Sequence, residues 1–177
     1  QTRACAVREY YLRWMEALPT VQDLAETDEE SLLKLWQGLG YYNRVRNMQK
    51  AAKEILEAHD GEFPGTYADI LTLPGIGEYT AGAIASNCFD EPTPAVDGNV
   101  LRVLSRLTED EADITKQSTR KKYTEMLRGI YPEQNCGDFT QGLMEIGAIV
   151  CVPSGAPRCD LCPVRDYCGA CEHGTAR

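Results

Sequence analysis

The chain has 177 residues, which is enough for one or two small domains that each bury a hydrophobic core. No apolar run is long enough to cross a bilayer and no signal segment opens the chain, so the sequence predicts a water-soluble protein without a membrane partner. The formal net charge of −9 argues against a generic nucleic-acid binder, because Lys and Arg supply most non-specific affinity for phosphate. The basic residues are nonetheless grouped at 43–53 and 120–122, which is compatible with one basic face on an acidic body.

The predicted elements are all helices, and no segment shows the sustained alternation of a strand. Thr27 and Glu30 have the spacing of a capping box, which predicts a helix through Trp36 that Gly38 ends. The other predicted helices cover residues 7–18, 45–56, 66–72, 78–88, 100–107, 116–130 and 137–150. The sequence therefore predicts an all-α fold, an array of short helices around a shared core.

Between the helices predicted at 66–72 and 78–88 lies the sequence LPGIG, in which Gly75 and Gly77 flank one isoleucine. Glycine lets the backbone approach a ligand closely, and successive N–H groups at the start of a helix can bind a phosphate. This turn is a candidate phosphate contact, although a glycine-rich turn is more often only a turn.

Asp97 lies twenty residues after Gly77, directly before the Gly-Asn pair that opens the next predicted helix. A short carboxylate in this place is usually an N-cap, because it accepts hydrogen bonds from the free amides of the first turn. The alternative is a charge-stabilising carboxylate held in a partly buried cleft. The residues alone leave both roles open.

Four of the eight cysteines lie close together near the end of the chain, with the spacing C-x7-C-x2-C-x5-C. They are Cys151, Cys159, Cys162 and Cys168. Disulfides are the less favoured interpretation, because disulfide frameworks are typical of small secreted chains. Four thiolates in one loop suit either zinc or a [4Fe–4S] cluster, so the spacing predicts a metal centre and leaves the metal open.

The remaining cysteines have weaker signals. Cys171, three residues after Cys168, is a spare candidate ligand. Cys5, Cys88 and Cys136 are expected to be ordinary buried or half-buried thiols.

Three segments together resemble the helix-hairpin-helix DNA glycosylases that carry an iron–sulfur loop. Residues 73–84 (LPGIGEYTAGAI) resemble the hairpin, residues 96–106 (VDGNVLRVLSR) resemble the segment with the catalytic aspartate, and the cysteine run resembles the cluster loop. The resemblance covers essentially the whole chain. It implies a six-helix-barrel-like domain at 1–109 and a second helical domain at 110–177, whose loop 151–168 holds a [4Fe–4S] cluster, with zinc as the alternative.

Local features favour one branch of this superfamily. The endonuclease III branch has a Schiff-base lysine at the position of Tyr79, so strand-cleaving lyase chemistry is expected to be absent. QTR at 1–3, GLGYYNRVRN at 38–47 and DGN at 97–99 resemble the MutY-type adenine DNA glycosylases. The resemblance therefore implies removal of adenine mispaired with 8-oxoguanine or guanine in double-stranded DNA, by hydrolysis of the N-glycosidic bond.

The resemblance also implies roles for single residues. Asp97 would stabilise an oxocarbenium-like sugar, and Asn99 and Tyr79 would order the pocket. Glu145 matches a position that lines the adenine pocket, with a solvated helix face as the alternative, and Tyr42 is expected in the core. The residues that match positions entering the duplex beside a flipped base are Gln1, Thr2, Leu39 and Tyr41.

Two further expectations concern the ends of the sequence. In the family, the general acid is a glutamate just before the residues that QTR matches, and a separate domain that reads 8-oxoguanine follows the cluster loop. We therefore expect this chain to be a catalytic core that excises adenine barely or not at all by itself. The gap after Cys151 is seven residues, one longer than the usual six. We also expect a monomer in the bacterial cytoplasm, acting at the nucleoid.

Two alternatives stay open. One is a monofunctional thymine-mismatch glycosylase of the same superfamily, since a tyrosine at position 79 also occurs there. The other is a non-catalytic DNA-binding module whose hairpin contacts phosphates and whose cysteines hold zinc. Bound iron together with adenine excision would exclude the second.

Overall fold

The computed structural model of the protein describes residues 4–176, and the side chains of residues 7–176. Within these residues all regular structure is helical, as predicted, and there is no β-strand. No helix of this part of the chain is both long and apolar enough to cross a membrane. The chain divides into two compact units, and the boundary between them falls between Ile76 and Gly77. The boundary predicted at residue 109 lies inside the second unit and stays a prediction.

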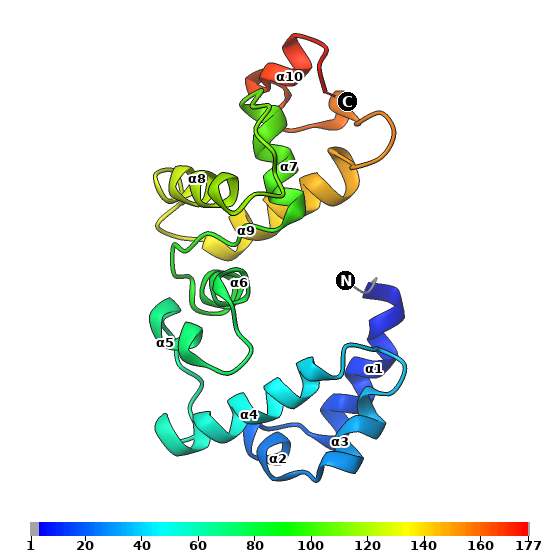
Figure 1. Cartoon of the computed structure of the whole chain (residues 1–177), viewed down its shortest axis with the longest axis vertical. Coiled ribbons are helices and arrows are strands. Elements are labelled where there is room, and N and C mark those ends of the chain that lie inside the picture. The colour runs from blue at the N-terminus through cyan, green and yellow to red at the C-terminus, as the bar shows by residue number, and fades with distance from the viewer. Residues whose placement is uncertain (1–3, 177) are drawn as a thin grey trace. The chain divides into compact units, whose positions relative to one another are not determined.

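The first unit contains five helices, and α4 is the longest of them. They are α1 (Ala4–Ala17), α2 (Val21–Glu26), α3 (Glu29–Trp36), α4 (Asn43–Ala58) and α5 (Tyr67–Thr72). α2 packs along α4, and α3 contacts both α1 and α4 (Figure 1). Leu18, Leu32 and Val45 are buried at the centre of this unit. Trp14 and Trp36 pack against this cluster and contact each other edge to face, with ring centroids 5.8 Å apart.

The start of α3 differs from the predicted capping box by one residue. Asp28 is the N-cap, and its carboxylate accepts a hydrogen bond from the Ser31 N–H at 2.9 Å. Thr27 instead ends α2, since its own N–H donates to the Asp23 carbonyl. Thr27 and Asp28 are both residues that can cap a helix. Thr27 closes α2 with its backbone N–H, and Asp28 is the residue that caps α3.

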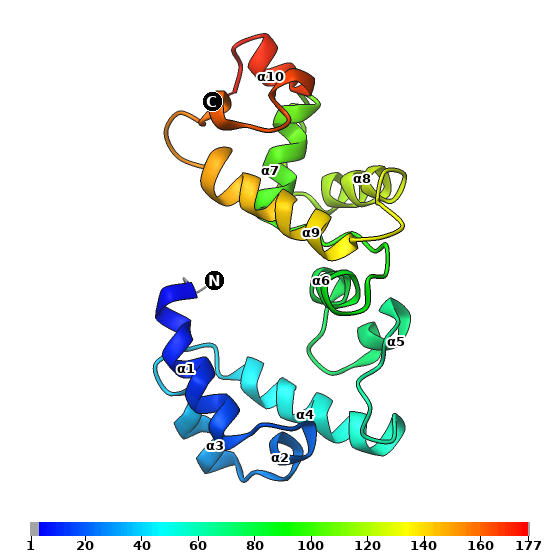
Figure 2. The ribbon, with the colours of Figure 1, turned by 180° about the vertical axis from the view of Figure 1, so that it is seen from behind.

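The second unit contains four longer helices and a C-terminal segment of short turns. They are α6 (Glu78–Phe89), α7 (Gly98–Leu107), α8 (Gln117–Arg128), α9 (Cys136–Glu145), a π-helical turn (Ile146–Val150), two 3-10 turns (Cys159–Leu161 and Arg165–Tyr167) and α10 (Gly169–Glu172). The helix predicted at 137–150 thus changes to π-helix after Glu145. α7 lies across α9 (Figures 1 and 2). Its residues Val100, Leu101 and Leu104 pack with Tyr123 and Leu127 of α8 in the buried core.

Helices α6 and α9 are joined by polar contacts between residues far apart in the sequence. Asp90 ends α6 in the left-handed conformation (φ 52°), and its carboxylate accepts hydrogen bonds from the N–H groups of Asn135 and Cys136. It therefore caps the start of α9 from another element. Further along the pair, the Thr140 hydroxyl donates to the buried Ser86 hydroxyl at 2.9 Å.

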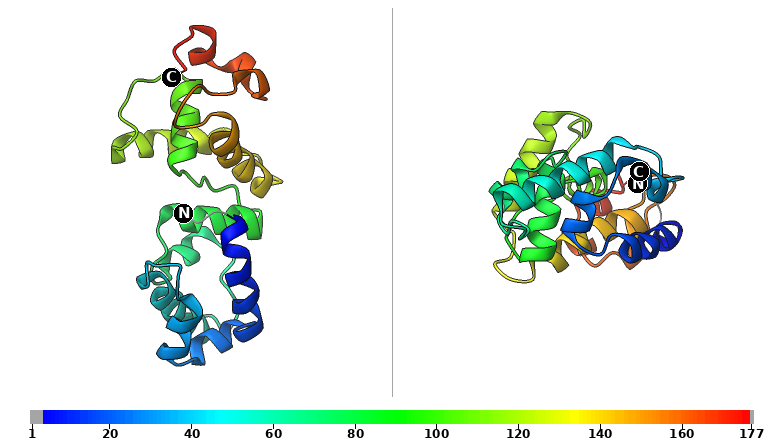
Figure 3. Two further views of the ribbon diagram at one scale, coloured as in Figure 1. Left: turned by 90° about the vertical axis from the view of Figure 1, so that its right-hand side faces the viewer. Right: turned by 90° about the horizontal axis from the view of Figure 1, so that it is seen from below.

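The C-terminal segment is held at the C-terminal end of α7 (Figure 3). The carboxylate of Glu109 accepts a hydrogen bond from the Thr175 hydroxyl at 2.7 Å and lies 2.6 Å from Nδ1 of His173. Gly169, the first residue of α10, fits closely here, since a Cβ on it would lie 3.2 Å from the Cβ of Glu109. Glu109 therefore fixes α10 from both sides.

Candidate functional site

Asp97 is the N-cap of α7, in an extended conformation before the helix. Its Oδ1 accepts a hydrogen bond from the Val100 N–H at 2.8 Å, and its Oδ2 accepts one from the Asn99 side-chain amide at 3.0 Å. The residue is half-buried. An ionised carboxylate has about four lone-pair sites, so the cap leaves acceptor capacity free. The capping role and a charge-stabilising role are therefore compatible in one side chain.

Arg102, one turn further along α7, orients the amide that contacts Asp97. Its Nη2 donates to Oδ1 of Asn99 at 2.9 Å and to the Gly147 carbonyl at 2.6 Å, and its Nε donates to the Cys151 carbonyl at 2.8 Å. Burial lowers the pKa of Arg102, and the nearby charge of Asp97 opposes this effect. The guanidinium thus connects the start of α7 to the first residue of the cysteine loop.

The sequence motifs assign no role to Arg102. One signal could have found it, because Asn99, Arg102 and Arg106 form a polar line on a helix whose other face is buried. Such a line predicts a polar partner, although the sequence does not say which.

The π-helical turn packs directly against the start of α7. A Cβ on Gly147 would lie 2.5 Å from the Cβ of Asn99 and 3.0 Å from its backbone, so only glycine fits at this contact. The glycine also brings its carbonyl within reach of Arg102. π-Helical turns are rare, and those that occur often lie at functional sites. The place of this turn beside Asp97 agrees with that tendency.

Tyr79 lies in the first turn of α6 and is 43% exposed. Partial burial raises its pKa, and the negative charge of Asp97 raises it further. The phenol is therefore neutral at pH 7 and can donate a hydrogen bond. Glu145 is exposed at the end of α9, directly before the π-helical turn, and its predicted place in a pocket stays a prediction.

The two glycines of the predicted hairpin differ. Gly75 has φ 79°, and a Cβ there would lie 2.5 Å from the Cβ of Asn47, so both backbone conformation and space require glycine. Gly77 is extended and faces open space, so the fold does not demand a glycine there. Gly77 gives the twelve-residue helix α6 no side-chain cap. The first N–H groups of α6 are therefore available to an anion.

The loop before α4 presents an aromatic side chain to solvent. Tyr41 is 72% exposed with φ 49°, and the Arg44 guanidinium lies 5.1 Å from its ring centroid. Tyr42 was expected in the core, and this expectation is wrong because its side chain is 38% exposed. Trp36 is the aromatic residue that packs inward here, and its indole N–H donates to the Gly40 carbonyl at 2.7 Å.

The other residues predicted to enter DNA are less informative. Leu39 is half-buried in the same loop. Gln1 and Thr2 lie outside the described residues.

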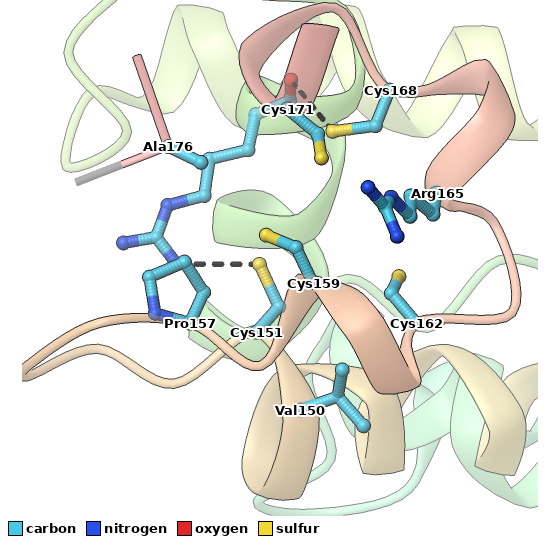
Figure 4. Close-up of a pocket in the computed structure, with 10 residues that line it drawn as sticks. Val150, Cys151, Pro157, Cys159, Cys162, Arg165, Cys168, Cys171 and Ala176 are labelled. Atoms are coloured by element: carbon cyan, nitrogen blue, oxygen red, sulfur yellow. Dashed lines mark hydrogen bonds between the residues drawn. The ribbon is translucent and has the colours of Figure 1, made fainter. Parts of the chain in front are cut away.

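Five cysteine thiols gather around one pocket at the C-terminal segment (Figure 4). They belong to Cys151, Cys159, Cys162, Cys168 and Cys171, and none is in a disulfide. Arg106 of α7 also lines the pocket, and its guanidinium donates to Sγ of Cys151 at 3.2 Å. Among the described residues, no three His, Cys, Asp or Glu side chains are grouped so as to hold one metal ion.

The cysteines outside this loop are only partly as predicted. Cys136 is buried, as expected. Cys88 is exposed, which contradicts the prediction, because the buried face of α6 consists of Ala81, Gly82, Ala85 and Ser86. The side chain of Cys5 lies outside the described part of the chain.

Comparison with known proteins gives consistent results. Residues 1–128 match the family described as HhH-GPD superfamily base excision DNA repair protein. A relative named adenine DNA glycosylase, from Rattus norvegicus, is 44% identical over 171 residues, which cover 96% of this chain and 33% of the relative. The chain thus spans about a third of the length of that protein.

Solved structures show the same fold. A thermostable thymine-DNA glycosylase superposes with a TM-score of 0.85 at 27% identity, over 97% of this chain and 79% of the other. Endonuclease III in a non-covalent complex with DNA superposes with a TM-score of 0.79 at 25% identity, over 98% of this chain and 79% of the other. The chain therefore belongs to the HhH-GPD superfamily of base excision DNA repair proteins.

Proposed function

We propose that the chain is the catalytic core of a monofunctional adenine DNA glycosylase, which removes adenine opposite 8-oxoguanine or guanine in double-stranded DNA. The observation that carries the proposal is the half-buried carboxylate of Asp97, oriented by Asn99 and Arg102. The name of the rat relative supports adenine as the base.

The chemistry requires a fixed negative charge beside the sugar. Breaking the bond between the sugar and adenine leaves an oxocarbenium-like cation, which a carboxylate stabilises. The hydrogen bonds from Asn99 and the Val100 N–H hold the carboxylate of Asp97 in one orientation. The neutral phenol of Tyr79 can order the substrate by donating a hydrogen bond. Protonation of the leaving adenine needs an acid. In the family, the resemblance assigns this role to a glutamate just before the residues that QTR at 1–3 matches.

Strand cleavage is excluded from the proposal by the residues of the hairpin. Lyase chemistry in this superfamily begins with an amine that attacks the sugar. Tyr79 holds the corresponding position, and residues 73–84 contain no lysine. The abasic product should therefore stay intact until it is treated with alkali.

Residues Cys151, Cys159, Cys162 and Cys168 would hold a [4Fe–4S] cluster. Zinc requires all four sulfurs about 2.3 Å from one ion, whereas each cysteine of a cluster binds a different iron. The four thiols line one pocket and are the donor set that such a cluster takes. When bound, the cluster would brace the loop that begins at the Arg102 contact. Iron and sulfide analysis of anaerobically prepared protein should give about four irons per chain, and stoichiometric zinc would reject this assignment.

Two groups of donors are candidates for contacts to DNA phosphates. One is the start of α6, with its uncapped N–H groups. The other is the basic segment from Arg44 to Lys53 in α4. Arg158 and Arg165 in the cysteine loop are exposed and are further candidates. Duplex binding should weaken steeply as the salt concentration rises.

The test is single-turnover excision by the full-length protein on duplexes that contain A opposite 8-oxoguanine. Asp97→Asn keeps an N-cap, because Asn caps as well as Asp does, and removes the charge. We expect a loss of about 10³-fold in rate, with duplex binding nearly unchanged. Asp28→Asn is the matched control, since Asp28 caps α3 in the same way. Undiminished excision by Asp97→Asn would reject the proposal, and preferential excision from G:T duplexes would favour a thymine glycosylase.

A further inference from the structure

The cysteine loop contains two overlapping sets of four thiols. The first is the set proposed above, which begins at Cys151. The second omits Cys151 and adds Cys171, and its spacing is C-x2-C-x5-C-x2-C. Pairs of cysteines two residues apart are typical of metal-binding loops, because one turn directs both thiols to the same side. Both sets line the same pocket.

The two cysteine pairs of the second set are each closed by a backbone hydrogen bond between residues three apart. The Cys162 N–H donates to the Cys159 carbonyl at 3.2 Å, and the Cys171 N–H donates to the Cys168 carbonyl at 3.1 Å. Each pair therefore occupies a single turn, and Figure 4 shows the thiols of both pairs gathered around the pocket. Cys171 therefore follows Cys168 at the same spacing, and with the same backbone hydrogen bond, as Cys162 follows Cys159.

Cys171 is fixed at the pocket by the packing of α10. Glu109 holds this helix through His173 and Thr175, and Ala170 is buried beside it. The side chain of Cys171 lines the same pocket as that of Cys159, a residue of both sets. Its position is thus set by the fold and does not depend on a mobile tail.

Cys151 is attached in a different way. It follows the π-helical turn, and seven residues, from Val152 to Arg158, separate it from the next thiol of the pocket. Its sulfur accepts a hydrogen bond from Arg106. The other four thiols come from two short turns that are close in sequence. Cys151 is therefore the ligand that the loop can lose while its remaining thiols stay together.

We propose that Cys171 is a reserve metal ligand, which completes a set of four thiolates with Cys159, Cys162 and Cys168 when Cys151 does not bind. In this exchange a bond from Sγ of Cys171 to iron forms as its thiol proton leaves to solvent, and the bond from Cys151 breaks as that thiolate takes up a proton. The inference rests on the proposed metal centre.

The experiment measures iron and acid-labile sulfide in the full-length protein and three variants, prepared without oxygen. Cys171→Ala should contain as much iron as the unchanged protein. Cys151→Ala should retain at least half of it, and the double variant Cys151→Ala/Cys171→Ala should lose nearly all. A Cys151→Ala protein as empty as the double variant would overturn the proposal. Loss of iron from Cys171→Ala alone would also overturn it, because Cys171 would then be a resident ligand.

Two controls complete the design. Cys159→Ala removes a thiol that both sets share and should abolish iron binding, whereas Cys88→Ala removes an exposed thiol outside the loop and should leave it unchanged. If Cys151→Ala does not fold by circular dichroism, the same comparison is made with Cys151→Ser, alone and together with Cys171→Ala. Absence of iron from the unchanged protein would reject the metal centre itself, and iron that disappears only with Cys151 would reject the reserve ligand alone.

Discussion

The start of α7 and the cysteine loop belong to the same unit and meet at Arg102, yet they are held by different forces. Asp97 and Asn99 are fixed by hydrogen bonds within the protein and by the buried helix behind them. Residues 151–168 contain only two short 3-10 turns, and the loop packs little apolar surface into the core. The carboxylate site is therefore preformed, whereas the loop depends on what its thiols bind.

This difference predicts how a change in one region of the second unit affects the other region. A change at the thiols should loosen the loop and reach Asp97 only through the Arg102 contact to the Cys151 carbonyl. A change beside Asn99 should reduce the proposed excision while the loop keeps the proposed metal. The following measurements test this separation.

The largest effect is expected from removal of the metal with a chelator. The amide hydrogens of residues 151–168 should then exchange as in an unfolded peptide, because no packed core remains to protect them. Those of α7 and α8 should keep their protection, since these helices share the buried core around Tyr123. Hydrogen exchange followed by mass spectrometry gives both results. Loss of protection in α7 together with the loop would show that the two regions form one cooperative element.

Gly147→Ala should reduce excision by about 100-fold while iron content stays constant. The added Cβ would lie 2.5 Å from the Cβ of Asn99, so the amide beside Asp97 must shift, and displacements of about 1 Å near a reaction centre have effects of this size. Gly142→Ala is the matched control, because it lies in α9 with open space around its Cβ. The control should keep its activity and gain up to about 1 kcal/mol of stability. Equal activity in both variants would contradict the prediction.

Arg102→Lys should have a smaller effect. The excision rate should fall about tenfold, and the free energy of unfolding should fall by about 2 kcal/mol. Lysine keeps the charge, but its ammonium cannot reproduce the planar fork that contacts Asn99, Gly147 and Cys151 together. Arg128→Lys, an exposed position at the end of α8, serves as the control. Denaturant unfolding and single-turnover kinetics measure the two effects, and an unchanged rate would remove Arg102 from the positioning of Asn99.

The smallest effect is expected from a change at Asp110, which lies outside the start of α7 and the cysteine loop. Its effect on stability serves as a reference for the other variants. A hydrogen bond from Lys122, with others from the Ala112 N–H and the Tyr123 hydroxyl, lowers the pKa of Asp110 to about 2. A lowered carboxyl pKa stabilises the fold above the unfolded value near 4, and this stabilisation is lost as the pH falls through about 2. Asp110→Asn should therefore lower the melting temperature at pH 7, and the difference should vanish by about pH 2.

The parts of the site that could be predicted from the sequence are those with local signals. Asp97 before a helix and the spaced cysteines are recognisable within about twenty residues, and the helices follow from apolar spacing. Arg102 and Gly147 could not be assigned, because their contacts join residues 45 apart and depend on how α7 and the π-helical turn pack. The expectation for Tyr42 failed because apolar character alone does not tell which aromatic packs inward, and here Trp36 packs against the core while Tyr42 is exposed.

The capping of α9 by Asp90 has a consequence for the order in which the protein folds. Asp90 and Ser86 meet partners 46 and 54 residues later in the chain. A chain is synthesised at 5–20 residues per second, so α6 emerges from the ribosome about 2–10 s before α9. During that interval the carboxylate of Asp90 lacks the N–H donors of α9, and the Ser86 hydroxyl lacks its bond from Thr140 and keeps only its bond to the Gly82 carbonyl within α6. Closing so long a loop costs entropy before its contacts form, and the docking of α9 on α6 should therefore be among the last steps by which the second unit folds.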